Sequence, residues 1–156
     1  MRFIFFDHVL ELVPGKRILA TKAVGFDGEY FTSHSQGRPL LPATLTVEAI
    51  AQAAGWLNFI THQESIRMVV ALVEGVRFLR PVWPGELLTL EATVLFLHPE
   101  GVTVGGQARA GSEVVTTVER MVFANRKVDR SLFTPKELRH YEYIKAGTRA
   151  GGAQRP

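Results

Sequence analysis

Acid–base chemistry in this sequence centres on His34 and Glu48. His34 lies in a stretch rich in Gly, Ser and Pro that has the composition of a loop, and Glu48 lies in the mainly apolar stretch that follows. An imidazole can take up a proton near neutral pH, and a carboxyl group kept neutral by burial can donate one. Such a pair suits removal of a proton next to a carbonyl group, followed by loss of a hydroxyl.

The segment between these two residues is expected to be stiff. Gly37 permits a tight bend, whereas Pro39 and Pro42 restrict the backbone just before a predicted helix. The first turn of a helix has free N–H groups, and those near Ala43 to Leu45 suit a carbonyl oxygen that gains negative charge. A base, an acid and an oxyanion site would then converge at this place.

Each feature also has a simpler interpretation. A single histidine in a loop is usually polar surface, and a glutamate near a helix N-terminus can reach solvent, where the helix dipole stabilises it. The other histidines lack the spacing of a zinc motif, and the chain has no cysteine. We therefore predict neither a metal site nor a cysteine nucleophile.

One long helix is predicted in the body of the chain, over residues 44–62, with Thr44 as its N-cap. Apolar residues occur on nearly every side of this segment, which is typical of a helix buried inside a domain. Glu48 and Gln52 are the exceptions, and their i, i+4 spacing places them on one face. The pattern therefore predicts a carboxyl group in an apolar setting.

Alternating apolar residues and turn signals predict about six strands around this helix. The expected strands cover residues 7–13, 16–24, 67–79, 86–97, 101–110 and 113–125. Short connections between them indicate antiparallel pairing. The predicted fold class is α+β, with an antiparallel sheet wrapped around one long central helix, which is the hotdog fold.

Length and charge place limits on the function. The 156 residues suffice for one domain, which we place at residues 1–126. Residues 127–156 form a basic tail with a predicted helix over 134–146 and a disordered end. Positive charge is concentrated there, since residues 126–156 contain eight Lys and Arg against three Asp and Glu. A body with slight acidic excess argues against nucleic-acid binding, and no apolar run is long enough to span a membrane, so a cytoplasmic protein is expected.

The sequence resembles the FabZ/FabA-type 3-hydroxyacyl-acyl carrier protein dehydratases. Their pattern, approximately HFPGxPxxPGxLxxEAxAQ, matches HSQGRPLLPATLTVEAIAQ at residues 34–52 without a gap. Two flanking blocks, at residues 7–18 and 76–95, are similar as well. The likeness extends over about residues 6–125.

This resemblance implies a hotdog homodimer with shared active sites, commonly assembled into a hexamer as a trimer of dimers. His34 would remove the C2 proton of a 3-hydroxyacyl chain on acyl carrier protein, and Glu48 of the other subunit would protonate the departing hydroxyl. The predicted substrate-binding residues are Gly37, Pro42, Ala43 and Gln52. Among them, the Ala43 N–H would hold the thioester carbonyl and Gln52 would orient Glu48. No metal or cofactor is required.

The chain departs from the pattern at three positions. Ser35 and Gln36 replace a Phe-Pro pair, and Ala43 replaces a glycine. These changes bear on the substrate more than on the chemistry. Two alternatives stay open: a hotdog thioesterase, which would leave His34 without a role, and a non-catalytic module that binds acyl thioesters.

An acyl carrier protein is acidic, so basic side chains are candidate contacts for it. They are those of the tail together with Arg38, Arg67, Arg77 and Arg80.

Overall fold

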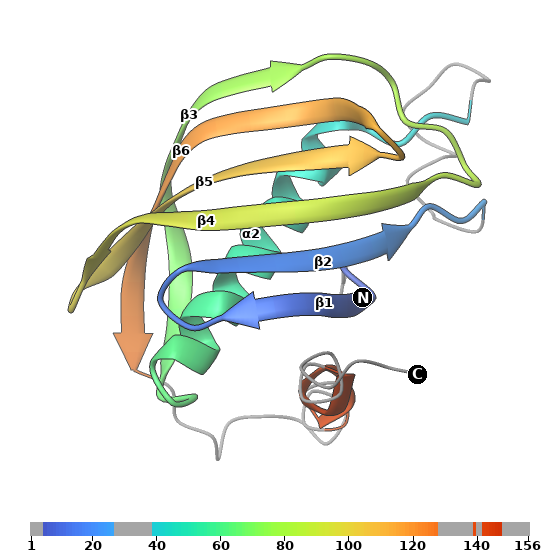
Figure 1. Cartoon of the computed structure of the whole chain (residues 1–156). Coiled ribbons are helices and arrows are strands. Elements are labelled where there is room, and N and C mark those ends of the chain that lie inside the picture. Colours follow the sequence, from blue (N-terminus) through green and yellow to red (C-terminus); the bar gives the residue numbers. More distant parts are fainter. Residues whose placement is uncertain (1–4, 27–38, 128–138, 140–141, 148–156) are drawn as a thin grey trace.

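A computed structural model describes residues 5–26, 39–127, 139 and 142–147 of the chain. These residues form one antiparallel sheet and the long helix α2 (Ala43–Thr61) (Figure 1). The strands are β1 (His8–Val13), β2 (Arg17–Ala23), β3 (Ile66–Phe78), β4 (Leu87–His98), β5 (Gly101–Ala110) and β6 (Glu113–Lys127).

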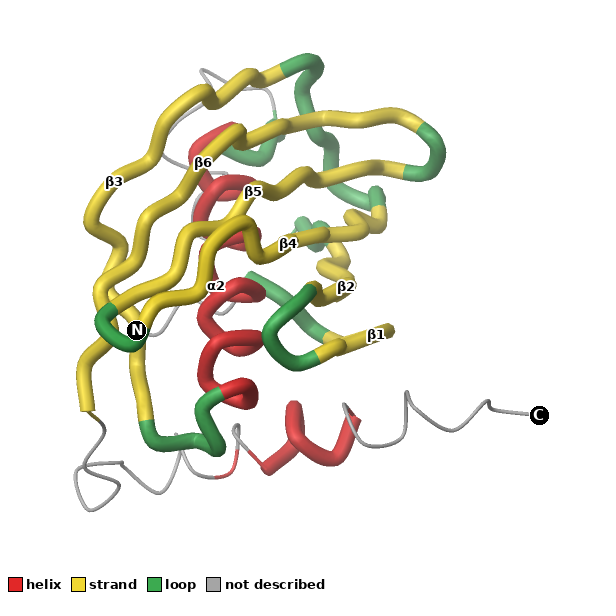
Figure 2. The backbone as a smooth tube through the Cα atoms, turned by 60° about the vertical axis from the view of Figure 1, so that its left-hand side comes forward, coloured by secondary structure: helices red, strands yellow, loops and turns green. Residues whose placement is uncertain are grey.

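The strand order in the sheet is β1-β2-β4-β5-β6-β3, and each neighbouring pair is antiparallel. The sheet curves around α2, which lies against its concave face (Figure 2). The predicted hotdog fold is therefore confirmed. Of the two edge strands, β3 is the longer, with 13 residues against six in β1.

The core lies between α2 and the sheet. Ile50 and Leu57 of α2 are fully buried, as are Leu90 and Met121 of the sheet. Gly106 marks the closest approach, because a Cβ at this position would lie 2.5 Å from Ile50 Cγ2. A side chain would push the helix from the sheet, so the glycine fixes how deeply α2 is seated.

The start of α2 differs from the prediction. The helix begins at Ala43, its N-cap is Pro42 with φ −52°, and no side chain caps it. The expected cap at Thr44 is wrong, because Thr44 already lies within the first turn. The hydroxyl that interacts here belongs to Thr46, which donates to the Ala43 carbonyl at 2.6 Å.

Part of the predicted tail helix packs against the body. Residues 142–147 are helical, whereas most of residues 134–141 lie outside the described part. Ile144 is only 2% exposed and belongs to the same core as α2. Lys145 pairs with Glu64 at 2.6 Å, just beyond the end of α2.

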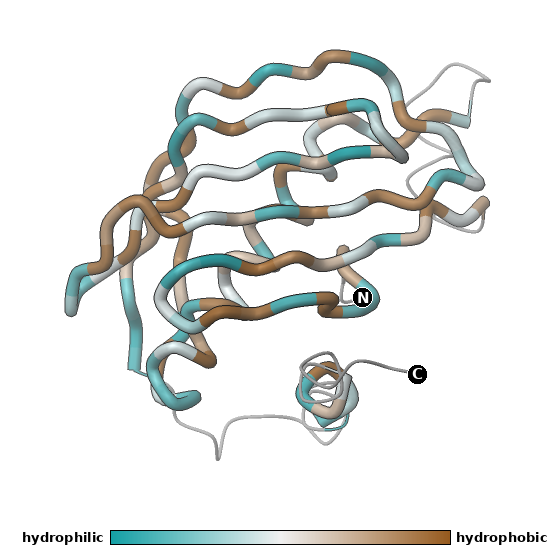
Figure 3. Tube along the Cα trace, in the orientation of Figure 1, coloured by the Kyte–Doolittle hydropathy of each residue, from teal (hydrophilic) through white to brown (hydrophobic). Residues whose placement is uncertain are grey.

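Apolar residues also occur on the surface. They recur along β3 and at one end of β4 in Figure 3. The large exposed side chains of these two strands are Val69, Val70, Leu72, Phe78, Leu87, Leu95, Phe96 and Leu97. Within the described ranges, no helix has the length and apolar character needed to cross a membrane.

Candidate active site

The first ten residues of α2 and the residue before them contain four of the six predicted site residues. They are Pro42, Ala43, Glu48 and Gln52. The other two, His34 and Gly37, lie outside the described residues. The described part of the site is therefore its helical half.

The structure brings Glu48 and Gln52 together. Gln52 Nε2 donates a hydrogen bond to Glu48 Oε1 at 2.8 Å. Gln52 Oε1 in turn accepts the backbone N–H of Phe5 at 2.9 Å. The amide is thus oriented by a segment 47 residues earlier in the chain, and it presents its NH₂ group to the carboxylate.

Glu48 is exposed in the single chain, so the predicted apolar setting is not found there. The reason is the direction of its face: Ala49, Ile50 and Ala53 point into the core and are at most 2% exposed. The exposed positions near the helix start include the apolar Ala43, so apolar residues on nearly every side of the sequence did not identify the buried face. Glu48 remains open to a partner or a substrate.

The first-turn amides of α2 include unused donors. The Leu45 N–H donates to the Pro42 carbonyl at 2.9 Å, which removes it from the predicted group. Among the residues that the structure describes, the amides of Ala43 and Thr44 have no hydrogen-bond partner. An uncapped helix start with exposed amides can bind an oxygen that gains negative charge.

Two contacts that the sequence did not reveal hold this helix start in place. The Leu41 N–H donates to the Val82 carbonyl at 2.9 Å, which ties the chain before α2 to the β3–β4 connection. Thr46 Oγ1 lies 2.7 Å from Thr116 Oγ1 of β6, and both residues are 1% exposed. A threonine inside an apolar helix was the only sequence signal for either contact.

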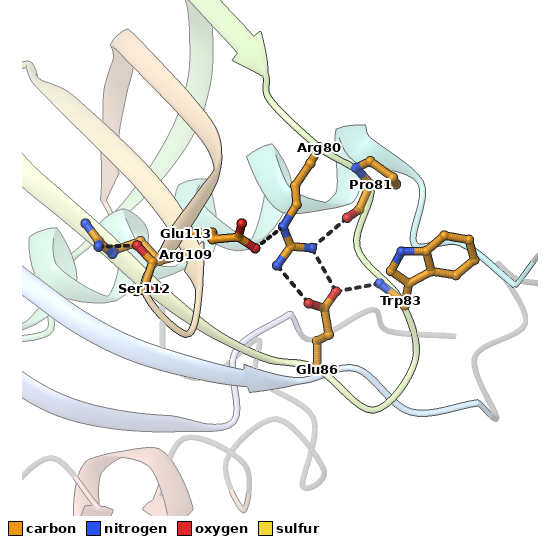
Figure 4. Close-up of polar contacts among 7 residues, drawn as sticks. All are labelled: Arg80, Pro81, Trp83, Glu86, Arg109, Ser112 and Glu113. Atoms are coloured by element: carbon orange, nitrogen blue, oxygen red, sulfur yellow. Dashed lines mark hydrogen bonds and ion pairs between the residues drawn. The ribbon is translucent and has the colours of Figure 1, made fainter.

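The β3–β4 connection is organised around Arg80 (Figure 4). Its guanidinium donates to both carboxylate oxygens of Glu86, at 2.8 and 3.1 Å, and to the Pro81 carbonyl at 2.8 Å. Glu86 Oε2 also accepts the Trp83 N–H at 2.7 Å. Arg80 Nε lies 3.0 Å from Glu113 Oε2 at the start of β6.

This network shifts the ionisation of its members. The hydrogen bonds from Arg80 are the main reason that the pKa of Glu86 lies below its ordinary value; burial opposes the shift and the Trp83 N–H adds to it. The pKa of Arg80 is raised, chiefly by the hydrogen bond to Glu86. Both groups are therefore charged at neutral pH.

The structure gives less support to several of the arginines predicted to contact an acidic carrier. Arg38 lies outside the described residues, and Arg80 is occupied by Glu86. Arg77 is exposed and lies 3.3 Å from Glu119. Across the described ranges, no three His, Asp or Glu side chains are grouped so that they could hold a metal ion.

Comparison with known proteins gives a consistent match. The family model of the FabA-like domain matches residues 1–119. The 3-hydroxyacyl-acyl-carrier-protein dehydratase FabZ of Magnetococcus marinus is 34% identical over 128 residues, which are 80% of this chain and 84% of the relative. The residues matched by the family model include every residue of the predicted site.

Solved structures share the fold across different activities. The dehydratase heterocomplex ApeI:P from Xenorhabdus doucetiae is similar with a TM-score of 0.65, at 18% identity and 89% coverage of both chains. A mutant thioesterase from Pseudomonas aeruginosa is similar with a TM-score of 0.57, at 12% identity, over 76% of this chain and 80% of that one. At these identities, the comparison establishes the fold and does not distinguish the two activities.

Proposed function

We propose that this chain, which belongs to the FabA-like domain family, removes water from 3-hydroxyacyl groups carried on acyl carrier protein. The product is a trans-2-enoyl thioester, and the reaction serves fatty-acid biosynthesis, as the FabZ relatives support. The observation that carries the proposal is the placement of Glu48, held by Gln52, on the helix whose uncapped first turn has two amides without a partner among the described residues. We place the protein in the cytoplasm.

The reaction needs one base, one acid and one oxyanion site. His34 takes the C2 proton, and the electrons of that C–H bond move toward the thioester carbonyl, whose oxygen is held by the Ala43 N–H. Glu48 then gives its proton to the 3-hydroxyl, which leaves as water while the C2–C3 double bond forms. Gly37 and Pro42 shape the backbone around the thioester.

The exposed position of Glu48 supports a site shared between two subunits. Among the described strands, the long edge strand β3 pairs with β6 alone, and it exposes Val69, Val70 and Leu72. Such an edge is suited to pairing with the same strand of a second copy. We propose that His34 of one subunit and Glu48 of its partner form each site, and that three dimers assemble into a hexamer.

The acidic carrier would contact basic residues near this interface. Arg67 and Arg77 on β3 are both exposed, and the Arg77 side chain is 71% exposed. Positive charge there would attract the carrier over several ångströms. Arg80 is a poorer candidate, because its donors are directed at Glu86 and Pro81.

Incubation of the purified chain with crotonyl thioester tests the activity. We expect loss of enoyl absorbance as water adds, without release of free thiol. Thiol release without hydration would instead establish a thioesterase, and binding without either change would establish a non-catalytic module. Acyl carrier protein and coenzyme A thioesters should be compared in parallel, with the carrier-bound form expected to react faster.

A further inference from the structure

We propose that Arg80 and Glu86 are positioning residues for the dehydration: their ion pair shapes the β3–β4 connection, which in turn holds the first turn of α2 where its Ala43 amide meets the thioester. The inference rests on the proposed function for its catalytic consequence. Its mechanical part, the link from Glu86 to Leu41, is independent of the reaction.

The first step is the closure of the connection itself. Glu86 binds Arg80 with both carboxylate oxygens and also accepts the Trp83 N–H, while Arg80 holds the Pro81 carbonyl (Figure 4). The chain between the two side chains is therefore fixed at several points. Both side chains are only 26% exposed, so solvent weakens this pair less than an ion pair on the open surface.

The second step connects the loop to the helix. Val82 lies between Pro81 and Trp83, both of which the ion pair holds, and its carbonyl accepts the Leu41 N–H at 2.9 Å. Val82 and Leu41 are 3% and 7% exposed, so this backbone pair is shielded from water. Pro42 follows Leu41 and restricts the backbone. A shift of Val82 therefore moves the amide of Ala43, two residues after Leu41.

The third step explains why the effect should be graded. The helix start has a second attachment, the buried contact between Thr46 and Thr116, which does not involve Glu86. Loss of the ion pair would loosen one of two attachments, and α2 would keep its place in the core. Activity should suffer more than folding, because small displacements of an oxyanion donor are costly.

The same geometry removes Arg80 from the set of carrier contacts. An acidic partner would have to displace Glu86 from a two-point contact at 2.8 and 3.1 Å. Arg77, on β3 just before this connection, has one contact with Glu119 at 3.3 Å and is mostly exposed. Substitutions of the two arginines should therefore have different effects. A change at Arg77 should weaken carrier binding, and a change at Arg80 should slow the chemical step.

The test compares Glu86→Ala and Glu86→Gln with Glu11→Ala in the full-length protein. Glu11 forms an equally close two-point pair with Arg17, at 2.8 and 2.9 Å, in the β1–β2 hairpin. Two readouts are required: kcat and KM on crotonyl thioester, and hydrogen exchange by mass spectrometry over residues 40–46. Glu86→Gln keeps an acceptor for the Trp83 N–H and serves if Glu86→Ala does not fold.

We expect Glu86→Ala to lower kcat by about 10-fold to 100-fold, with KM changed by less than about twofold, and to speed exchange over residues 40–46. Glu86→Gln should fall between wild type and Glu86→Ala, and Glu11→Ala should leave both readouts unchanged. Unchanged exchange or unchanged kcat in both Glu86 variants would overturn the proposal, as would an equal loss in Glu11→Ala. An inactive wild-type protein would refute the dehydratase assignment instead, and exchange would still test the link.

Discussion

The two halves of α2 differ in what covers their outer face. At the C-terminal half, Trp56 contacts the rings of Phe6 and Phe59, at centroid distances of 6.5 and 5.8 Å. At the N-terminal half, Ala43, Thr44 and Glu48 are exposed. Within the described part of the chain, the C-terminal half is closed by the N-terminal segment, and the N-terminal half is open.

This difference separates stability from chemistry along a single helix. The closed half gains from burial of large apolar side chains, which is the main favourable contribution to folding. The open half has a carboxylate and two first-turn amides that lack a partner among the described residues; these groups contribute little to folding, and we propose that they act on the substrate. Gln52 lies between the two halves and links them, because it binds both Phe5 and Glu48.

The largest expected effect is loss of catalysis at the open half. His34→Ala and Glu48→Gln should each lower the rate of crotonyl thioester hydration by about 10²-fold to 10⁴-fold, since each removes a group that transfers a proton. The melting temperature should change little in Glu48→Gln, because Glu48 is exposed in the single chain. Near-normal activity in either variant would refute the proposed roles.

Mixing the two inactive variants tests whether the open half is completed by a partner. If each site takes His34 from one subunit and Glu48 from the other, random exchange should restore about a quarter of wild-type activity, through heterodimers with one intact site. Subunit exchange must be verified independently, for example by mass spectrometry of differently labelled chains. No recovery despite exchange would place both residues of a site in one subunit.

The closed half should respond in stability rather than in rate. Phe6→Ala removes a ring that is 6% exposed, so we expect a loss of about 3 kcal/mol in the free energy of unfolding. Urea unfolding measures this loss, and kcat at a temperature well below the melting point should stay within about twofold of wild type. A large fall in kcat would show that the two halves are not separable.

Substitution of Gln52 should lower both kcat and the free energy of unfolding, each by less than the substitutions above. Gln52→Ala frees the Glu48 carboxylate and leaves the Phe5 N–H without its acceptor, so we expect a roughly 10-fold lower kcat and a loss of about 1 kcal/mol in stability. Gln52→Glu is the matched variant: it keeps an acceptor for Phe5 but replaces the NH₂ group that donates to Glu48 with a carboxylate oxygen. Stability near wild type with reduced kcat in Gln52→Glu would assign the catalytic effect to the donated hydrogen bond.

Most of the fold could be predicted from the sequence because its signals are local. The turn residues Pro14-Gly15 and Gly111 lie between strands that were predicted and that pair as neighbours, and the strand at residues 101–110 was correct at both ends. The helix was placed within one residue of α2 at each end. Periodicity and turn chemistry act over a few residues, so they can be recognised without tertiary contacts.

The site was only partly predictable because its geometry depends on distant contacts. The spacing of Glu48 and Gln52 predicted a shared face, but the bond from the Phe5 amide to Gln52 spans 47 residues and has no sequence signal. The link from Leu41 to Val82 is a backbone contact, so side-chain types do not encode it. Arg80 was a candidate contact for the acidic carrier because a sequence shows the charge of a side chain without showing its partner, which is Glu86.

The smallest expected effect concerns acid, at the loop that supports the open half. The pKa of Glu86 lies below its ordinary value of 4.5, chiefly because of the hydrogen bonds from Arg80. The ionised form is therefore favoured in the folded state, and the resulting stabilisation is present above pH 4.5 and is lost as the pH falls through the lower folded pKa.

Glu86→Gln should be less stable than wild type by about 1 kcal/mol at pH 7, and this difference should shrink as the pH falls below 4.5. Urea unfolding of both proteins between neutral and acidic pH measures the difference. A stability difference that stays constant with pH would show that Glu86 contributes through packing rather than through its charge. The loop that supports the open half would then be stabilised in the same way as the closed half, by packing contacts.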